Sequence, residues 1–163
     1  MSTREDFIAR FGGVFEHSPW IAGAAYDAGL PTAHTPDGIH GMLCDMLRAA
    51  SDEAKLALIA AHPDLAGKLS RAGALTAASS AEQAAAGLDS LSDEDFETFT
   101  ALNAAYTEKF AFPFVMAVKG RGPGEILAAF RTRLENDRDT EIATALVEIE
   151  RIALLRIQDL FWP

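Results

Sequence analysis

The sequence predicts an all-α fold, a single compact helical domain that spans residues 1–163 with about eight helices. Through most of the chain, apolar residues recur at the three- and four-residue spacing of one helix face. Serine, threonine, proline and glycine mark the expected helix ends. Strand signals are scarce, and we find no repeat, linker or low-complexity segment. A chain of 163 residues suits one domain that can bury a core of its own.

The first half of the chain divides into short, capped helices. The dipeptide Ser18-Pro19 places a cap before a proline, and Gly29 ends the helix that follows. Thr35-Pro36 repeats this arrangement ahead of an apolar stripe formed by Ile39, Met42, Leu43, Met46 and Leu47. Ser51 begins a further helix, which should stop near His62 because the residue before a proline is pushed out of the helical region.

The second half contains longer helices. Ser79 begins an alanine-rich helix that we expect to reach Leu91, and Ser92 caps the next one. One side of this helix carries Phe96, Phe99, Asn103, Tyr106 and Phe110. Pro123 begins another helix, and the last one runs from about Thr140 to Phe161.

One apolar stretch departs from the helical pattern. Residues 112–118 are short and apolar, and Pro113 separates them from the preceding helix. Because a lone strand has no sheet to join, we expect a buried, extended connection between helices.

Composition and charge exclude several classes of protein. The chain carries 14 basic and 24 acidic side chains, so its net charge is −10. This charge argues against binding to nucleic acid or to an anionic membrane surface. Cys44 is the single cysteine, so no intrachain disulfide can form, and a reducing compartment follows. The longest apolar run is too short to span a bilayer, and the charged N-terminus lacks a signal core, so we expect a cytoplasmic protein.

The last helix contains a charge within its predicted buried stripe. That stripe consists of Ile142, Leu146, Ile149, Ala153 and Leu160. Arg156 falls among these residues, and a buried arginine needs an anionic or hydrogen-bonding partner because it cannot lose its charge. The partner is either a structural carboxylate or the polar head of a ligand. In the preceding helix, Arg131 and Arg133 flank the apolar stripe, so we expect both to be solvated.

Two more residues are candidates for chemistry, each with a structural alternative. His62 lies where a helix ends and a proline fixes the backbone, which suits a side chain that moves protons near neutral pH. Alternatively, it caps the last carbonyls of its own helix. Glu82 follows Ser79 by three residues, a pattern that fits a capping box, although a helix start also binds polar ligands.

No metal site is expected. His34 and His40 lie six residues apart, a spacing that matches no familiar zinc motif. Cys44 lies inside a helix and is expected to be a buried, inert thiol. His17 lies beside a helix start, where a structural role is favoured. The sequence contains no phosphate-binding loop, dinucleotide fingerprint or serine elbow.

Several segments along the chain form a recognisable series. They are residues 11–20 (FGGVFEHSPW), 62–68 (HPDLAGK), 79–83 (SSAEQ), 86–88 (AGL), 102–106 (LNAAY), 109–115 (KFAFPFV) and 155–160 (LRIQDL). Taken together, these segments resemble the OHCU decarboxylases (2-oxo-4-hydroxy-4-carboxy-5-ureidoimidazoline decarboxylases). The resemblance covers nearly the whole chain in the same order, and it departs at Ala111, where the family usually has glycine, and at Val115, where it usually has isoleucine.

The resemblance implies an all-α, usually homodimeric carboxy-lyase without a cofactor, which completes the conversion of urate to (S)-allantoin in purine degradation. The family's catalytic histidine corresponds to His62, and its substrate-binding glutamate and arginine correspond to Glu82 and Arg156. The resemblance also implies substrate contacts at Pro63, Ser79, Ser80, Ala81, Gln83, Phe114, Val115, Met116, Ala117 and Val118.

The residues by themselves leave a second function open. A non-catalytic helical module that binds a small ligand or another protein would use Arg156 in a core ion pair and His62 as a helix cap. A metal-dependent hydrolase is a more distant alternative.

Overall fold

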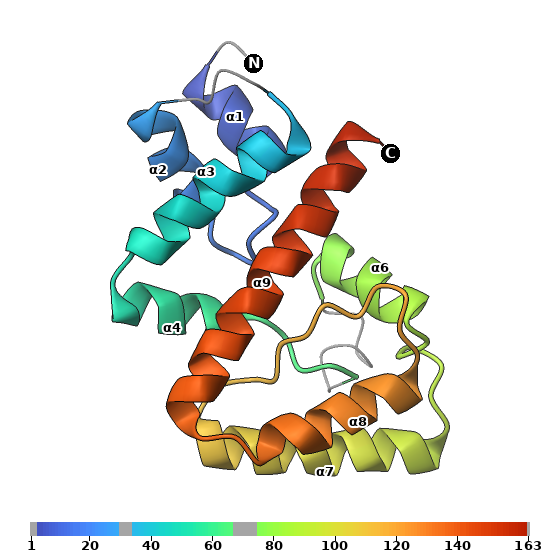
Figure 1. Ribbon diagram of the computed structural model, residues 1–163. Helices are drawn as coiled ribbons and strands as arrows, with labels where there is room; N and C mark the ends of the chain where they lie inside the picture. Colours follow the sequence, from blue (N-terminus) through green and yellow to red (C-terminus); the bar gives the residue numbers. More distant parts are fainter. Residues whose placement is uncertain (1–2, 30–33, 67–74, 163) are drawn as a thin grey trace. The chain divides into compact units, whose positions relative to one another are not determined.

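A computed structural model describes residues 3–29, 34–66 and 75–162 (Figure 1). This part of the chain is helical and contains no strand, so the all-α prediction is confirmed. Gly67 and Lys68, which belong to the resemblance, lie outside the described residues. The helices are α1 (Arg4–Phe11), α2 (Trp20–Ala28), α3 (Pro36–Ala49), α4 (Asp52–Ala61), α6 (Ala77–Ala85), α7 (Asp93–Phe110), α8 (Pro123–Leu134) and α9 (Arg138–Phe161).

Most helix ends follow the predicted caps. The hydroxyl of Thr35 accepts a hydrogen bond from the main-chain N–H of Gly38 at the start of α3, and Ser92 does the same for Asp95 in α7. Helix α4 ends directly before His62, as the following proline predicts. Ser18 is an exception, because its hydroxyl donates to the carbonyl of Glu16 and α2 begins without a side-chain cap.

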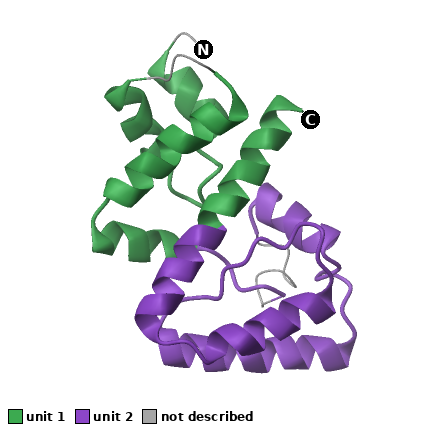
Figure 2. Ribbon diagram, in the orientation of Figure 1, with its two compact units in different colours: residues 1–61, 149–163 green, residues 62–148 purple. Residues whose placement is uncertain are grey.

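The chain divides into two compact units, residues 1–61 with 149–163 and residues 62–148 (Figure 2). We call them unit 1 and unit 2. Helix α9 contributes its first half to unit 2 and its second half to unit 1. Whether both units unfold together as one domain over residues 1–163 stays a prediction.

Unit 1 is built on aromatic and aliphatic side chains from its helices. Phe7 and Phe11, one turn apart on α1, are fully buried with ring centroids 5.0 Å apart. Phe161 at the end of α9 stacks on Phe11 at 6.2 Å. Helices α2 and α3 pack together and bury further apolar side chains, including Ile21, Ile39, Leu43 and Leu47. Burial of this apolar surface is the main source of stability for the unit.

Unit 2 has an aromatic core that fixes the non-helical stretch after α7. Phe114 stacks on Phe130 of α8 with ring centroids 3.9 Å apart, and Tyr106 of α7 lies edge-on to both rings. Residues 113–118 have no regular secondary structure, and every side chain from Phe114 to Val118 is buried. The prediction of a buried, non-helical connection between helices is therefore confirmed.

The buried face of α9 differs from its predicted stripe. Leu160 is 39% exposed, and Ile142 and Leu146 are half-buried. The buried residues are Glu141, Ala145, Glu148, Ile149, Ile152, Ala153, Arg156 and Ile157. These positions also recur at helical spacing, but three of them are charged. A pattern that counts only apolar residues therefore selects a neighbouring face of the helix.

Helix α7 ends at a residue in a conformation that favours glycine. Ala111 has a φ of +64°, in the left-handed region, and its N–H donates to the carbonyl of Thr107 at 2.8 Å. This geometry favours glycine at position 111, because a Cβ is unfavourable in this conformation.

We expect Ala111→Gly to stabilise the protein by about 0.5–1 kcal/mol, because relief of left-handed strain outweighs the added freedom of the unfolded chain. Ala104→Gly, at an exposed position inside the same helix, should instead destabilise it by about 1 kcal/mol. Urea unfolding of both variants measures the difference. A loss of stability in both variants would contradict this account of the helix end.

Candidate active site

His62 begins unit 2 and lies in a loop, residues 62–66, that follows α4 directly. Its side chain is buried, as are those of Leu65 and Ala66. Burial raises the pKa of the neighbouring Asp64 carboxyl above its ordinary value. The imidazole of His62 is thus buried, and the Asp64 carboxyl, two residues later, loses its own proton less readily than an exposed carboxyl does.

Two side-chain amides hold the main chain of this loop. Gln83 of α6 donates to the carbonyl of Asp64 (3.3 Å) and accepts from the N–H of Ala66 (2.9 Å). Asn103 of α7 donates to the carbonyl of Leu65 (2.9 Å). Gln83 was expected to contact the substrate, and the structure shows that its side-chain amide also hydrogen-bonds the main chain of the loop.

Helix α6 begins earlier than the sequence indicated, and this removes the capping-box explanation of Glu82. Thr76 is the cap, and its hydroxyl accepts from the N–H of Ser79 at 3.2 Å. Ser79 therefore lies inside the helix and cannot act as the cap of a box with Glu82. The misassignment arose because Thr76 has the same capping chemistry three residues before Ser79.

The residues of the SSAEQ segment occupy different faces of α6. Ser79, Glu82 and Gln83 share one face by their spacing, with Ser79 and Gln83 buried and Glu82 half-buried. Ser80 and Ala81 are exposed. Ligand contacts from side chains are thus feasible for the first three, whereas Ser80 and Ala81 place their side chains in solvent.

The extended segment, residues 114–118, belongs to no helix or strand, so no regular secondary structure pairs its main-chain donors and acceptors. The carbonyl of Val115 accepts from Arg133 (2.6 Å) and that of Val118 from the N–H of Arg121 (3.0 Å). The five N–H groups from Phe114 to Val118 have no acceptor within the described part of the chain. Buried main-chain donors are nearly always satisfied, and a molecule with several acceptor atoms would supply the partners that the described residues do not.

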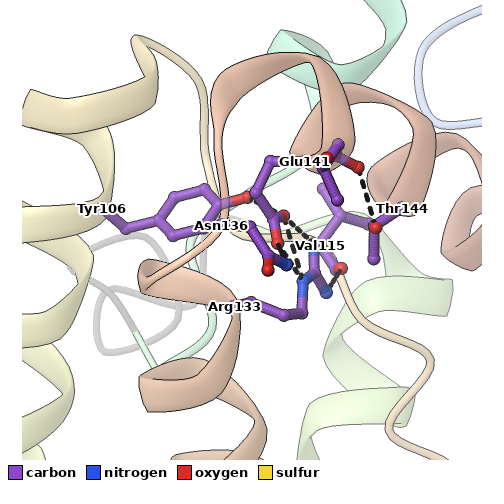
Figure 3. A network of polar contacts seen from close by, with 7 residues as sticks. Tyr106, Val115, Arg133, Asn136, Glu141 and Thr144 are labelled. Carbon is purple, nitrogen blue, oxygen red and sulfur yellow. Dashed lines mark hydrogen bonds and ion pairs between the residues drawn. The ribbon is translucent and has the colours of Figure 1, made fainter.

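A buried ion pair anchors this segment (Figure 3). Arg133 is 8% exposed and Glu141 is fully buried, with 2.9 Å between Nη2 and Oε2. Tyr106 donates to the same carboxylate at 2.6 Å, and Asn136 donates at 3.1 Å. The guanidinium also supplies the hydrogen bond to Val115, so the pair joins three helices to the segment.

The electrostatics of this network follow from its contacts. Burial by itself would raise the pKa of Glu141, but the hydrogen bonds from Arg133 and Tyr106 outweigh it and hold this pKa below its ordinary value. Burial, together with Glu141, raises the pKa of Tyr106. Glu141 is therefore a carboxylate and Tyr106 a neutral donor at neutral pH.

The expectation that Arg133 is solvated is wrong, whereas Arg131 is exposed as expected. The guanidinium of Arg133 lies 4.2 Å from the ring centroid of Phe114, in cation–π geometry. Its partner Glu141 lies beyond the end of α8, and no helical spacing connects the two residues in the sequence.

Arg156 belongs to unit 1 and pairs with a carboxylate of the protein, one of the two kinds of partner that the sequence left open. Its guanidinium donates to Glu16 and to the carbonyl of Val14, both at 3.4 Å. Arg156 and Glu16 are both buried. The neighbouring His17 has a φ of +49° and an exposed side chain. Buried contacts before α2 are made by its neighbours, since Glu16 accepts from Arg156 and the Ser18 hydroxyl donates to the carbonyl of Glu16.

The structure groups most of the expected site residues in one unit. His62, Pro63, residues 79–83 and residues 114–118 all belong to unit 2, whereas Arg156 belongs to unit 1. Within unit 2, α7 links the two main parts of the site. Asn103 holds the His62 loop, and Tyr106, on the same face, contacts Phe114.

The remaining histidine and cysteine candidates fit structural roles. Cys44 is buried, and burial raises the pKa of its thiol to about 12, so it is inert as expected. His40 Nε2 lies 3.2 Å from its sulfur and 2.8 Å from the carbonyl of Glu150. Among the described residues, no group of three or more histidine, cysteine or carboxylate side chains could hold a metal ion.

Membrane insertion finds no support in the described helices, since each is too short or too polar to cross a bilayer.

We expect Arg133→Met to lower the free energy of unfolding by about 3–5 kcal/mol at pH 7, because it leaves the buried Glu141 carboxylate without its cation. In the wild type, the lowered pKa of Glu141 stabilises the folded state at pH values above 4.5, the ordinary pKa of a glutamate. This stabilisation is lost as the pH falls through the depressed pKa. In the variant, the stranded carboxyl has a raised pKa and gains stability on protonation. The difference in the free energy of unfolding between wild type and Arg133→Met should therefore narrow from pH 7 to pH 4, as denaturant unfolding measures. A difference that stays constant with pH would contradict a buried ion pair between Arg133 and Glu141.

Arg156→Met should likewise cost about 3–5 kcal/mol, because it removes the cation that lies against the buried Glu16 carboxylate. The double variant with Glu16→Gln should recover part of this loss. Arg4→Met removes an exposed pair with Asp27 and serves as the control with little effect. An Arg156→Met protein as stable as the wild type would contradict a stabilising pair between Arg156 and Glu16.

Comparison with known proteins identifies the family. The OHCU decarboxylase family model matches residues 1–158. The 2-oxo-4-hydroxy-4-carboxy-5-ureidoimidazoline decarboxylase of Haloferax volcanii is 43% identical over 157 residues, which are 96% of this chain and 90% of that protein. The protein of the same name from Amia calva is 39% identical over 158 residues, covering 96% of this chain and 88% of that protein.

Solved structures have the same fold. A crystal structure of (S)-allantoin synthase superposes with a TM-score of 0.78 at 27% identity over 98% of this chain, which spans about half, 51%, of that chain. A crystal structure of OHCU decarboxylase in the presence of (S)-allantoin has a TM-score of 0.69 at 23% identity, covering 88% of this chain and 92% of that chain. Because the family model matches residues 1–158 of this chain, the chain belongs to the OHCU decarboxylase family.

Proposed function

We propose that this chain decarboxylates 2-oxo-4-hydroxy-4-carboxy-5-ureidoimidazoline (OHCU) to (S)-allantoin without a cofactor, with His62 as the catalytic residue. The observation that carries the proposal is the row of five buried N–H groups in residues 114–118, in the same unit as the buried His62. OHCU is a small molecule rich in acceptor atoms, namely a carboxylate, a ring carbonyl and a ureido carbonyl. Such a molecule can satisfy several of these donors at once.

Decarboxylation leaves an electron pair that must be accepted. When the bond between C4 and the carboxylate breaks, its electrons form a C4=C5 double bond, and the electrons of the ring C5=N bond move to that nitrogen, which takes a proton. Loss of the C4 hydroxyl proton and addition of a proton to C5 then give the ring carbonyl of allantoin. The substrate's own C=N bond is thus the electron sink, and the protein supplies orientation and proton transfer.

His62 has the proton-transfer role in this scheme. It polarises or deprotonates the C4 hydroxyl, and a proton is returned to one face of the ring, which sets the S configuration. Its burial supports this role, because a site without bulk water strengthens hydrogen bonds to the developing charge. Pro63 fixes the backbone next to the imidazole and contacts the substrate.

Other residues bind and orient the substrate. Glu82, on the same face of α6 as Ser79 and Gln83, accepts hydrogen bonds from ureido or ring N–H groups. Residues 114–118 donate main-chain hydrogen bonds to the substrate's oxygen atoms. For Ser80 and Ala81, whose side chains are exposed, contact is confined to the main chain. Arg156 binds a carbonyl or the developing negative charge while it remains paired with Glu16.

Two further points belong to this proposal. The chain forms a homodimer, as its resemblance to the family implies, and it acts in the cytoplasm as a metabolic enzyme.

A coupled assay tests the proposed reaction. OHCU is generated from urate by urate oxidase and hydroxyisourate hydrolase, and circular dichroism follows the appearance of (S)-allantoin. Addition of this protein should accelerate (S)-allantoin formation well beyond spontaneous decay, and the acceleration should survive EDTA. A spontaneous rate, together with an unchanged melting temperature in (S)-allantoin, would favour the non-catalytic module. Loss of activity in EDTA with recovery in zinc would favour a metal-dependent enzyme.

His62→Asn should keep the fold and lower the turnover rate by about 10²–10⁴-fold, because an amide cannot transfer protons. His17→Asn is the matched control, since His17 is exposed, lies in unit 1, and has a backbone conformation that asparagine tolerates. Stopped-flow rates and circular dichroism spectra of both variants provide the comparison. Near wild-type turnover in a folded His62→Asn protein would remove His62 from the chemistry.

A further inference from the structure

We propose that Asn103 is a positioning residue for His62, because it holds the main chain of the loop that carries the imidazole. The inference rests on the proposed function, in which His62 is the catalytic residue. Asn103 acts through the backbone and does not itself need to touch the substrate.

The contacts of the loop form a continuous clamp. Three consecutive residues, Asp64, Leu65 and Ala66, each give one main-chain group to a side-chain amide. Gln83 takes the first and third of these groups, and Asn103 takes the middle one. The two amides come from different helices, α6 and α7, so the loop is held from two independent supports.

The conformation of the loop requires such support. Ala66 has a φ of +53°, a left-handed conformation that residues with a Cβ seldom adopt. The loop also contains Pro63, which ends the helical path after α4, so helical hydrogen bonds do not hold the loop. Contacts from outside the loop must therefore maintain its shape, and the three amide contacts do so.

Asn103 is kept at this position at a cost. It is 7% exposed, and its Oδ1 atom is buried without a hydrogen-bond donor among the described residues. A leucine of similar size would leave no such oxygen in the core. The hydrogen bond from Nδ2 to Leu65 is the contact that requires an amide here, which indicates selection for the position of the loop rather than for stability alone.

Asn103→Leu removes the donor at nearly constant size, and Phe99→Leu is the matched control. Phe99 lies one turn earlier on α7, is fully buried, packs against Phe130 and makes none of the three amide hydrogen bonds to the loop. We expect Asn103→Leu to lower kcat about 10- to 100-fold with KM changed less than about threefold, because small misplacements of a catalytic group have effects of this size. Phe99→Leu should lower stability but leave the kcat of the folded protein unchanged.

Amide hydrogen exchange supplies a readout that does not depend on activity. The N–H of Ala66 is bonded to Gln83, so its exchange rate reports whether the loop is held. Asn103→Leu should increase that rate at least about tenfold over the rate in Phe99→Leu, and the NMR signal of the His62 ring should shift. Unchanged exchange at Ala66, or equal kcat in the two variants, overturns the inference.

A second variant keeps the test decisive if Asn103→Leu does not fold. Asn103→Asp retains size and polarity but places an oxygen against the carbonyl of Leu65, so it should show the same loss of kcat and faster exchange at Ala66. A folded Asn103→Asp protein with wild-type kcat overturns the inference. A wild-type protein without decarboxylase activity overturns the proposed function instead, and the exchange measurement still decides whether Asn103 fixes the loop.

Discussion

The buried ion pair between Arg133 and Glu141 is the interaction on which unit 2 depends. Two charges removed from water are tolerated only when each is paired and fully hydrogen-bonded, and here the carboxylate accepts from three side chains. These side chains come from α7, α8 and the turn before α9. The same guanidinium holds the carbonyl of Val115, so the charge requirement and the path of the extended segment are satisfied together.

This arrangement holds residues 114–118 outside any regular secondary structure. A helix consumes its own N–H groups, and a sheet would pair them with a neighbouring strand. Residues 114–118 lie in neither, because the ring of Phe114 is fixed against Phe130 and Arg133 donates to the Val115 carbonyl. In the His62 loop, hydrogen bonds from side-chain amides of α6 and α7 replace those of secondary structure. Both parts of the proposed site are thus irregular backbone supported by helices.

Sequence patterns predicted the architecture better than the site. Caps and prolines located most helix ends, and the extended segment was recognised because proline and a short apolar run fit neither helix nor sheet. The buried charges were harder to find. Arginines beside the apolar stripe of a helix are usually solvated, and this rule gave the wrong result for Arg133. Its partner Glu141 lies eight residues later, beyond a turn, where no helical pattern points to it. Glu16 and Glu141 gave no signal, because an acidic side chain beside a helix start is usually exposed. The roles of His62, Glu82 and Arg156 came from resemblance, since their residue types also fit structural explanations.

In the proposed function, the main-chain N–H groups of residues 114–118 bind the substrate's acceptor atoms. Titration of ¹⁵N-labelled protein with (S)-allantoin, followed by NMR, tests this binding mode. We expect the amide signals of Phe114 to Val118 to shift together with saturation and to exchange more slowly with solvent, while the amides of α1 and α2 stay unchanged. Saturable binding of (S)-allantoin that leaves these five amides unaffected would contradict it.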